Sequence, residues 1–275
     1  TLILGDDSAL GSGAVSVEGG SLDLNGSSIA NDVVLGGGAI AGNGGAISGV
    51  ISETGGAQSL VVDSAVTLSG SNTYSGGTTI QSGTLVAAAS GSLGTAGTVT
   101  LADGTTGTAD VGLLLDASAA SVTISRAVDV SASGTGAVTI GSSAMATGTQ
   151  AVFSGPIGLG RSVTLTGAAG GDRTQFSGGI SGTGDVTVTT AGSGRVILIG
   201  AANTFDGNVT ISDNSRLQLS DGSGTSTSLI PDTASVTVGS GARLSLAKGN
   251  NSESIDVLLG SGTVEAISGS NTLVV

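Results

Sequence analysis

The sequence contains no cysteine, no histidine and no tryptophan. Without cysteine the chain can form no disulfide, no thiolate nucleophile and no structural zinc site of the usual kind. Without histidine it has neither a Ser-His-Asp triad nor the commonest general base. The absence of cysteine also suits an exported protein that stays unfolded in transit. Carboxylates remain as the main candidates for any chemistry.

Long apolar runs and a surplus of positive charge are also missing. A membrane-spanning helix needs about 18 consecutive apolar residues, whereas the best local runs, at residues 111–115 and 196–199, are far shorter. The 20 acidic and 7 basic residues give a net charge of −13, which disfavours binding to phosphate-rich partners. We therefore expect no nucleic-acid binding and no direct membrane insertion of this segment.

Short alternating patterns fill the chain. Glycine occurs 51 times and proline only twice, yet a mean hydropathy of +0.41 argues against a disordered low-complexity segment. An apolar residue, a threonine or other polar residue and a second apolar residue recur, for example at residues 66–68, 99–101 and 163–165. In a strand the two apolar side chains face a core and the middle one faces water. Because no apolar spacing of 3.6 residues is sustained, the sequence predicts an all-β protein.

Every aromatic residue occupies the same short phrase, a ring followed by a small or polar residue and then glycine, as in Tyr74-Ser75-Gly76. The other rings are Phe153, Phe176 and Phe205, and Ile47-Ser48-Gly49 is an aliphatic copy. Most intervals between the copies are roughly 23 to 29 residues, and the longest, from Tyr74 to Phe153, is close to three of them. A large apolar group at this period indicates a repeat architecture.

Strands of three to five residues are too short for a typical sandwich and suit a parallel β-helix. The preference for right-handed parallel connections makes it right-handed. Coils of 23 to 29 residues predict roughly ten to twelve coils in a single β-helix over residues 1–275, with the rings at one corner and each following glycine letting the backbone turn away. Apolar runs at both ends lead us to expect a fragment of a longer array or a processed product.

Two segments carry a more specific pattern. Residues 66–85 contain a strand, Gly70, Asn72-Thr73-Tyr74, Gly76 and a Thr-rich strand, and residues 196–211 repeat this order around Asn203-Thr204-Phe205. Both segments resemble the passenger-associated transport repeat of bacterial autotransporters, with good matches over residues 47–104 and 153–219. The resemblance implies a stalk of a passenger domain, secreted by the type V route and displayed on the surface of a Gram-negative bacterium. Passengers with different activities carry this repeat, so it identifies the scaffold and not the activity.

Paired carboxylates are the candidates for glycan cleavage. Asp6 with Asp7, Asp206 with Asp213, and Asp221 are available, and Arg216 could neighbour Asp206 or Asp213 on adjacent coils. All these aspartates lie beside Gly, Asn or Ser, which is typical of Asx turns. The same reasoning applies to calcium, for which residues 206–208 and 213–214 offer oxygen ligands. We therefore predict no catalytic residue, no metal site and no cofactor.

The remaining polar residues are interpreted structurally. Asn72 and Asn203 are expected to cap a turn amide or to adopt a left-handed backbone. The threonine rows raise ice binding as an idea, but the unequal intervals between them argue against a flat lattice. The arginines are interpreted as scattered and solvated, and they are residues 126, 161, 173, 195, 216 and 243.

The sequence therefore predicts a surface-exposed, extracellular stalk with a structural and adhesive role and no enzymatic activity. Its expected partners are other cells, matrix or a host surface. Apolar strands at both termini favour an alternative, a self-assembling extracellular fibre that pairs end to end. A polysaccharide-cleaving β-helix enzyme is a further alternative.

Overall fold

The structure is a computed structural model that describes residues 1–170, 173–222, 228–249 and 251–275. All regular elements in these residues are β-strands, and they stack in register in parallel sheets, as in the pairs β10–β12 and β20–β23. The predicted parallel β-helix is confirmed. Within the described residues no helix has the length and apolar character needed to cross a membrane. The chain divides into two compact units, residues 1–116 with 126–138 and residues 117–125 with 139–275.

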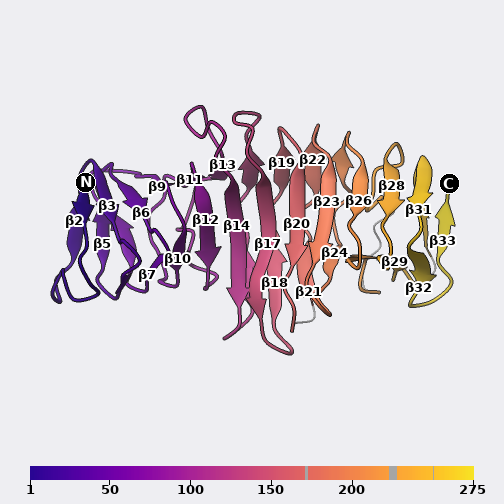
Figure 1. Cartoon of the computed structure of the whole chain (residues 1–275), viewed down its shortest axis with the longest axis horizontal. Coiled ribbons are helices and arrows are strands. Elements are labelled where there is room, and N and C mark those ends of the chain that lie inside the picture. Colours follow the sequence, from indigo (N-terminus) through magenta and orange to yellow (C-terminus); the bar gives the residue numbers. More distant parts are fainter. Residues whose placement is uncertain (171–172, 223–227, 250) are drawn as a thin grey trace. The chain divides into compact units, whose positions relative to one another are not determined.

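Unit 1 contains three stacks of short parallel strands that follow one another in chain order (Figure 1). The first stack consists of β1 (Leu2–Ile3), β3 (Ser21–Asp23), β6 (Ala39–Ala41), β9 (Leu60–Val62), β11 (Thr78–Ile80), β13 (Val99–Leu101) and β16 (Val128–Val130). The second consists of β4 (Ser28–Ile29), β7 (Gly45–Ile47), β10 (Val66–Leu68), β12 (Gly83–Ala87) and β14 (Val111–Ala117). The third consists of β2 (Val15–Val17), β5 (Val33–Leu35) and β8 (Ile51–Glu53).

Unit 2 is built in the same way, and each stack is named by its first and last strand. The β17–β31 sheet holds β17 (Val138–Met145), β20 (Val163–Gly167), β23 (Val186–Thr190), β26 (Val209–Ile211), β28 (Ser235–Val238) and β31 (Val257–Gly260). The β15–β32 sheet holds β15 (Val122–Ile124), β18 (Gln150–Phe153), β21 (Arg173–Phe176), β24 (Val196–Leu198), β27 (Arg216–Leu219), β29 (Arg243–Leu246) and β32 (Thr263–Ala266). The smaller stacks are β19 (Ile157–Leu159), β22 (Ile180–Gly182) and β25 (Thr204–Phe205), and β30 (Ser252–Ser254) with β33 (Thr272–Val274).

Stacking places identical residues above one another in the core. Val163 pairs with Val186, Val186 with Val209, and Val209 with Val236, and all four side chains are buried. Each buried valine contributes roughly 1.5–3 kcal/mol of hydrophobic stabilisation. The alternating apolar residues of the sequence therefore form continuous columns of aliphatic side chains in the core.

Coil length varies more than the aromatic phrase suggests. In unit 1, Ile40 pairs with Leu22 and closes a short coil, whereas Val130 pairs with Leu101 and closes a much longer one. Unit 2 has the same spread, because Leu244 pairs with Val264 across a short coil and Ile124 with Phe153 across a long one. The differences lie in the loops, since the strands remain in register.

All four rings are buried, but they do not share one corner as predicted. Phe153 and Phe176 lie at the ends of β18 and β21 in the β15–β32 sheet. Phe205 lies on β25, where it pairs with Gly182 of β22. Tyr74 lies in the loop between β10 and β11. The phrase therefore does not mark one fixed position in the coil.

In four of the five copies of the phrase, the glycine is required by close packing between coils. In Gly49, Gly76, Gly178 and Gly207 the backbone φ is not positive. Instead, each glycine lies against the backbone of the preceding coil. A Cβ on Gly178 would lie 2.0 Å from the carbonyl oxygen of Gly155, and one on Gly207 would lie 2.2 Å from that of Gly184. Glycine is therefore required there by close approach between coils.

Candidate functional site

Asn72 and Asn203 bridge neighbouring coils. The Ile51 amide donates to Asn72 Oδ1 at 2.8 Å, and Asn72 Nδ2 donates to the Ser92 carbonyl at 2.6 Å. Asn203 makes the same pair of bonds, accepting from the Ile180 amide at 2.7 Å and donating to the Leu229 carbonyl at 2.6 Å.

Both asparagines are buried and neither has a positive φ. The expected left-handed backbone is therefore wrong for these two residues. Their side chains cap the backbone of the coils on either side rather than their own turn. Each satisfies one amide and one carbonyl that would otherwise be buried without a partner.

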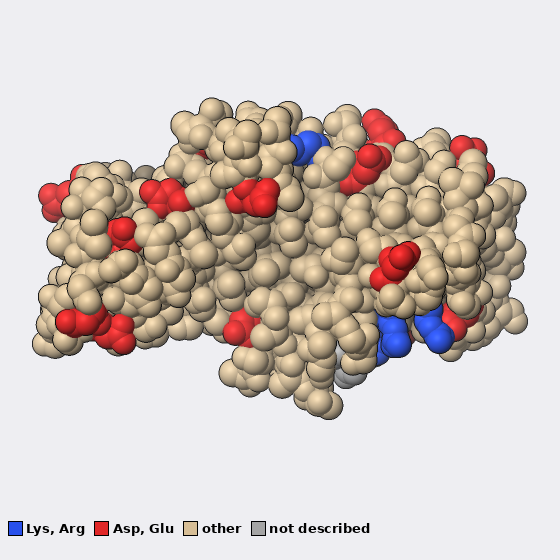
Figure 2. All heavy atoms as spheres, viewed as in Figure 1, with Lys and Arg blue, Asp and Glu red and all other residues tan. Residues whose placement is uncertain are grey.

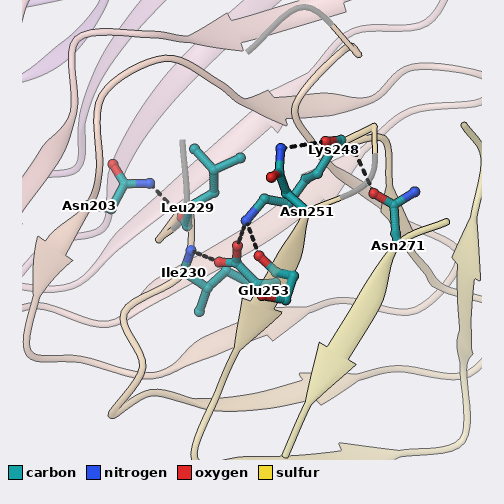
Figure 3. A network of polar contacts seen from close by, with 8 residues as sticks. Asn203, Leu229, Ile230, Lys248, Asn251, Glu253 and Asn271 are labelled. Atoms are coloured by element: carbon teal, nitrogen blue, oxygen red, sulfur yellow. Dashed lines mark hydrogen bonds and ion pairs between the residues drawn. The ribbon is translucent and has the colours of Figure 1, made fainter. Parts of the chain in front are cut away.

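Glu253 makes a bridge like those of Asn72 and Asn203, with a carboxylate in place of the amide (Figure 3). The Ile230 amide, one residue beyond the carbonyl that Asn203 bonds, donates to Glu253 Oε1 at 2.6 Å. The ammonium of Lys248 donates to Glu253 Oε2 and to the Ser252 carbonyl, the latter at 2.7 Å. Lys248 is the only lysine in the sequence. Both side chains are almost completely buried.

Burial raises the pKa of the Glu253 carboxyl, while the hydrogen bond and charge of Lys248 oppose the rise. The Lys248 backbone is itself held at both ends. Its amide donates to Asn271 Oδ1 at 2.9 Å, and its carbonyl accepts from Asn251 Nδ2 at 2.9 Å. With no surface exposure, this pair stabilises the local loop and offers no access to a substrate.

The acidic candidates of the sequence lie in loops, and Asp6, Asp7, Asp213 and Asp221 contact nearby backbone or side chains. Asp6 Oδ1 accepts from the Ser8 hydroxyl and amide, and these bonds hold the pKa of Asp6 below its usual range. Asp7 Oδ1 accepts from the Ser28 amide at 2.7 Å, and Asp213 Oδ1 accepts from the Ser240 amide at 2.8 Å. Asp221 forms an ion pair with Arg173 at 3.3 Å. In the described residues no ion pair joins Arg216 to Asp206 or Asp213.

Of the calcium candidates, Asn208 belongs to a ladder of turn side chains. Ser162 Oγ accepts from the Asp185 amide, Asp185 Oδ1 from the Asn208 amide, and Asn208 Oδ1 from the Ser235 amide, at 3.1, 2.8 and 3.0 Å. Each oxygen is thus used by the amide one coil further on. Across the described ranges, no three acidic side chains gather closely enough to suggest a metal site.

Four arginines form a column that the sequence analysis missed. Arg216 pairs with Arg243 in register. Arg195 directly precedes Val196, which pairs with Leu217, and Arg173 directly precedes Thr174, which pairs with Val196. Arg173, Arg195, Arg216 and Arg243 therefore occupy the same position on four successive coils, and we call them the arginine column. The expectation that the arginines are scattered is wrong for these four.

A sequence signal for the column exists. Each of these arginines stands immediately before an apolar-x-apolar strand core, as in Arg216-Leu217-Gln218-Leu219 and Arg243-Leu244-Ser245-Leu246. Since every strand of the stack begins at the same register, the residue before the first inward side chain falls into one outward column. Figure 2 shows basic side chains gathered at the lower right, over the C-terminal strands of unit 2, beside acidic ones.

A groove on the outer face of the β15–β32 sheet runs along this column. Its volume is about 150 Å³, and Arg195, Arg216, Gln218, Arg243, Ser245 and Glu265 line it together with Leu217 and Ile267. Gln218, Ser245 and Glu265 form a second outward column two residues along each strand. Arg195 donates to Gln218 Oε1 at 3.0 Å, and Arg243 pairs with Glu265 at 3.2 Å.

The threonine rows are better aligned than their sequence spacing suggests. Thr139, Thr164, Thr187, Thr210 and Thr237 pair in succession along the β17–β31 sheet. Their unequal spacing along the chain does not disturb the register. Unequal intervals therefore do not prevent alignment of the threonines, because the loops absorb the differences in length.

Stacked parallel strands with inter-coil asparagine bridges define a parallel β-helical repeat protein. Residues 64–87 and 188–213 match the family model of the passenger-associated-transport-repeat. The first match contains Asn72 and Tyr74 and the second contains Asn203 and Phe205. The predicted resemblance is confirmed at these two places, and the repeats together with the parallel β-helix are consistent with an autotransporter passenger-like stalk. Comparison with curated proteins and with solved structures found no match.

Proposed function

We propose that this chain forms part of a passenger stalk outside a Gram-negative cell and mediates adhesion to other cells, matrix or a host surface, or aggregation of the cells themselves. The observation that carries the proposal is the pair of passenger-associated-transport-repeat matches on a parallel β-helix. Repeats of this kind support secretion to the cell surface or the surrounding medium. An ordered stack of coils suits the role of holding a surface away from the membrane.

Surface exposure and adhesion are tested on the source bacterium. External protease added to intact cells should degrade the protein while a periplasmic control stays intact. Deletion of the gene should reduce binding to host cells or matrix, or the settling of a cell suspension, and complementation should restore it. A protein protected from protease on intact cells contradicts surface display, and unchanged adhesion and settling contradict the adhesive role.

The same proposal assigns no enzymatic activity to this chain. The acidic side chains that could cleave a glycan are engaged in loops, as Asp213 is with the Ser240 amide. All four aromatic rings are buried and none is left as a sugar platform. A purified chain should release no product from a broad panel of polysaccharides. Turnover that is lost in Asp206→Asn or Asp213→Asn would instead support the polysaccharide-cleaving alternative.

A self-assembling extracellular fibre is the second candidate. Outermost strands in both units expose apolar side chains, including Ile3 at 61% and Leu259 at 52% of their surface. Edge strands with free hydrogen-bonding groups and apolar side chains are templates for pairing with a second chain. The fibre candidate predicts that mass measured by light scattering rises with protein concentration. A strictly monomeric chain at high concentration excludes it.

A further inference from the structure

The arginine column is an electrostatically unfavourable arrangement within this chain. Neighbouring strands of a sheet lie about 4.8 Å apart, and like charges directly opposite one another on adjacent strands destabilise the pairing. The chain has 20 acidic residues but only 7 basic ones. The column therefore concentrates four of the seven basic residues of the chain at one place.

Ion pairs engage the first and the last arginine of the column. Arg173 pairs with Asp221 at 3.3 Å and Arg243 with Glu265 at 3.2 Å. Between them, Arg195 donates to the neutral Gln218. Arg216 is exposed, and in the described part of the chain no ion pair includes its guanidinium. Three arginines against Glu265 leave the groove with a formal charge of +2.

The groove also offers what an anionic ligand needs besides charge. Arginine guanidinium groups bind planar carboxylate and tetrahedral sulfate or phosphate oxygens through paired N–H donors. The Gln218 and Ser245 side chains line the groove from the neighbouring column, and their hydrogen bonds to Arg195 and Glu265 help to fix its wall. Leu217 and Ile267 contribute an aliphatic part of the lining. Because guanidinium groups repeat once per coil, the groove suits a ligand whose negative groups repeat along an extended chain.

We propose that the arginine column and its groove bind an anionic polysaccharide through sulfate or carboxylate groups. This inference rests on the proposed adhesive function, since it names the class of partner. The net charge of −13 opposes any polyanion at long range, so binding depends on the local positive charge of the groove. Proteins that bind single-stranded nucleic acid combine basic grooves with exposed aromatic rings, and here all four rings are buried. The observations thus favour a polysaccharide over nucleic acid.

The purified chain is tested with a fluorescent heparin hexasaccharide as the sulfated probe, an oligogalacturonate as the carboxylated probe and dextran as the neutral control. Anisotropy should show saturable binding to at least one anionic probe and none to dextran. Affinity should fall with rising salt, because bound arginines release counterions. Arg216→Glu should weaken binding at least about tenfold, a change of about 1.4 kcal/mol. Arg216→Lys, which keeps the charge and loses the forked donor geometry, should weaken it severalfold.

Arg126→Glu is the matched control, because Arg126 lies in unit 1 and outside the column. It makes the same change of charge and should leave affinity within about twofold. Circular dichroism and the melting temperature of Arg216→Glu should equal those of the unaltered chain. Equal loss in Arg126→Glu and Arg216→Glu overturns the assignment of the site. Absence of binding to both anionic probes, or tighter binding to single-stranded DNA, overturns the class of ligand.

The outcome is distinguishable from failure of the adhesive role. If the purified chain binds the probe but the gene deletion leaves adhesion unchanged, the site stands and the proposed function falls. If adhesion depends on the gene but Arg216→Glu adheres normally and binds no less polysaccharide, the function stands and the site falls.

Discussion

Phe153 and Phe176, which lie on adjacent strands, stack with their ring centroids 5.0 Å apart and an interplanar angle of 4°. Both rings are buried, and this contact couples two coils of unit 2 through their largest side chains. Phe176→Ala should reduce the free energy of unfolding by about 3–5 kcal/mol, because it leaves a cavity that neighbouring coils fill only in part. Denaturant unfolding followed by circular dichroism measures this loss. Phe176→Leu, which retains most of the volume, is the control and should lose less.

The stacking itself is measured by a double-mutant cycle. Phe153→Leu, Phe176→Leu and the double variant should give a coupling energy of about 0.5–1.5 kcal/mol beyond the burial of each ring. Additive losses would mean that the two rings are buried independently and that their parallel arrangement contributes nothing to stability.

Gly178 illustrates how tightly the coils approach. Gly178→Ala should destabilise the protein by about 1–3 kcal/mol through overpacking against the Gly155 carbonyl, because the obstacle is backbone and not a movable side chain. Gly13→Ala is the matched control, since no atom lies within 4 Å of its Cβ position. Thermal melting of the two variants should separate them. Equal melting temperatures would show that the contact at Gly178 relaxes at no cost.

Glu53 should give the protein part of its dependence on pH. The Gln58 amide, then the Ser75 hydroxyl and amide, donate to this carboxylate and hold the pKa of Glu53 below its usual value. A carboxyl whose pKa is lowered on folding contributes stability above its unfolded pKa of about 4.3 and loses it as pH falls through the lower folded pKa.

Glu53→Gln should therefore remove this contribution at pH 7 and flatten the acid side of the stability curve. Unfolding midpoints measured between pH 7 and pH 3 test the prediction, with Glu18→Gln as the comparison, since Glu18 is an exposed carboxyl of the same type. If the Glu53→Gln and unaltered proteins lose stability in parallel as the pH falls, the assignment is wrong.

The buried pair of Lys248 and Glu253 should be far more sensitive to single changes than to a double change. Lys248→Met leaves a buried carboxylate without its partner and should cost about 3–5 kcal/mol. The double variant Lys248→Met with Glu253→Leu removes both charges and should recover much of that loss, less the unsatisfied Ile230 amide. Chemical unfolding of Lys248→Met, of Glu253→Leu and of the double variant provides the comparison. A double variant as unstable as the sum of the singles would mean that the two residues act separately.

Local patterns of the sequence were sufficient for the strands and for the parallel β-helix. The apolar-Thr-apolar triplets at 66–68, 99–101 and 163–165 lie within strands. A period of two residues places both apolar side chains of each triplet on the same face of a strand, where they can be buried. The Asn-Thr-aromatic motif was also recognisable, because the same bridge recurs at Asn72 and Asn203.

Relations between coils were not predictable to the same degree. The arginine column depends on which side chains of successive coils lie opposite each other, and loops of unequal length hide that register. The role of Gly178 depends on how closely the backbone of the preceding coil approaches, which no local pattern reports. Lys248 and Glu253 replace an asparagine bridge by an ion pair, and their shared burial follows only from the packing.

Thr139, Thr164, Thr187, Thr210 and Thr237 are aligned despite unequal spacing along the chain. The length of a loop can therefore change without moving the strands that it joins. Insertions and deletions that fall between strands alter the projecting surface of one layer and leave its neighbours in frame.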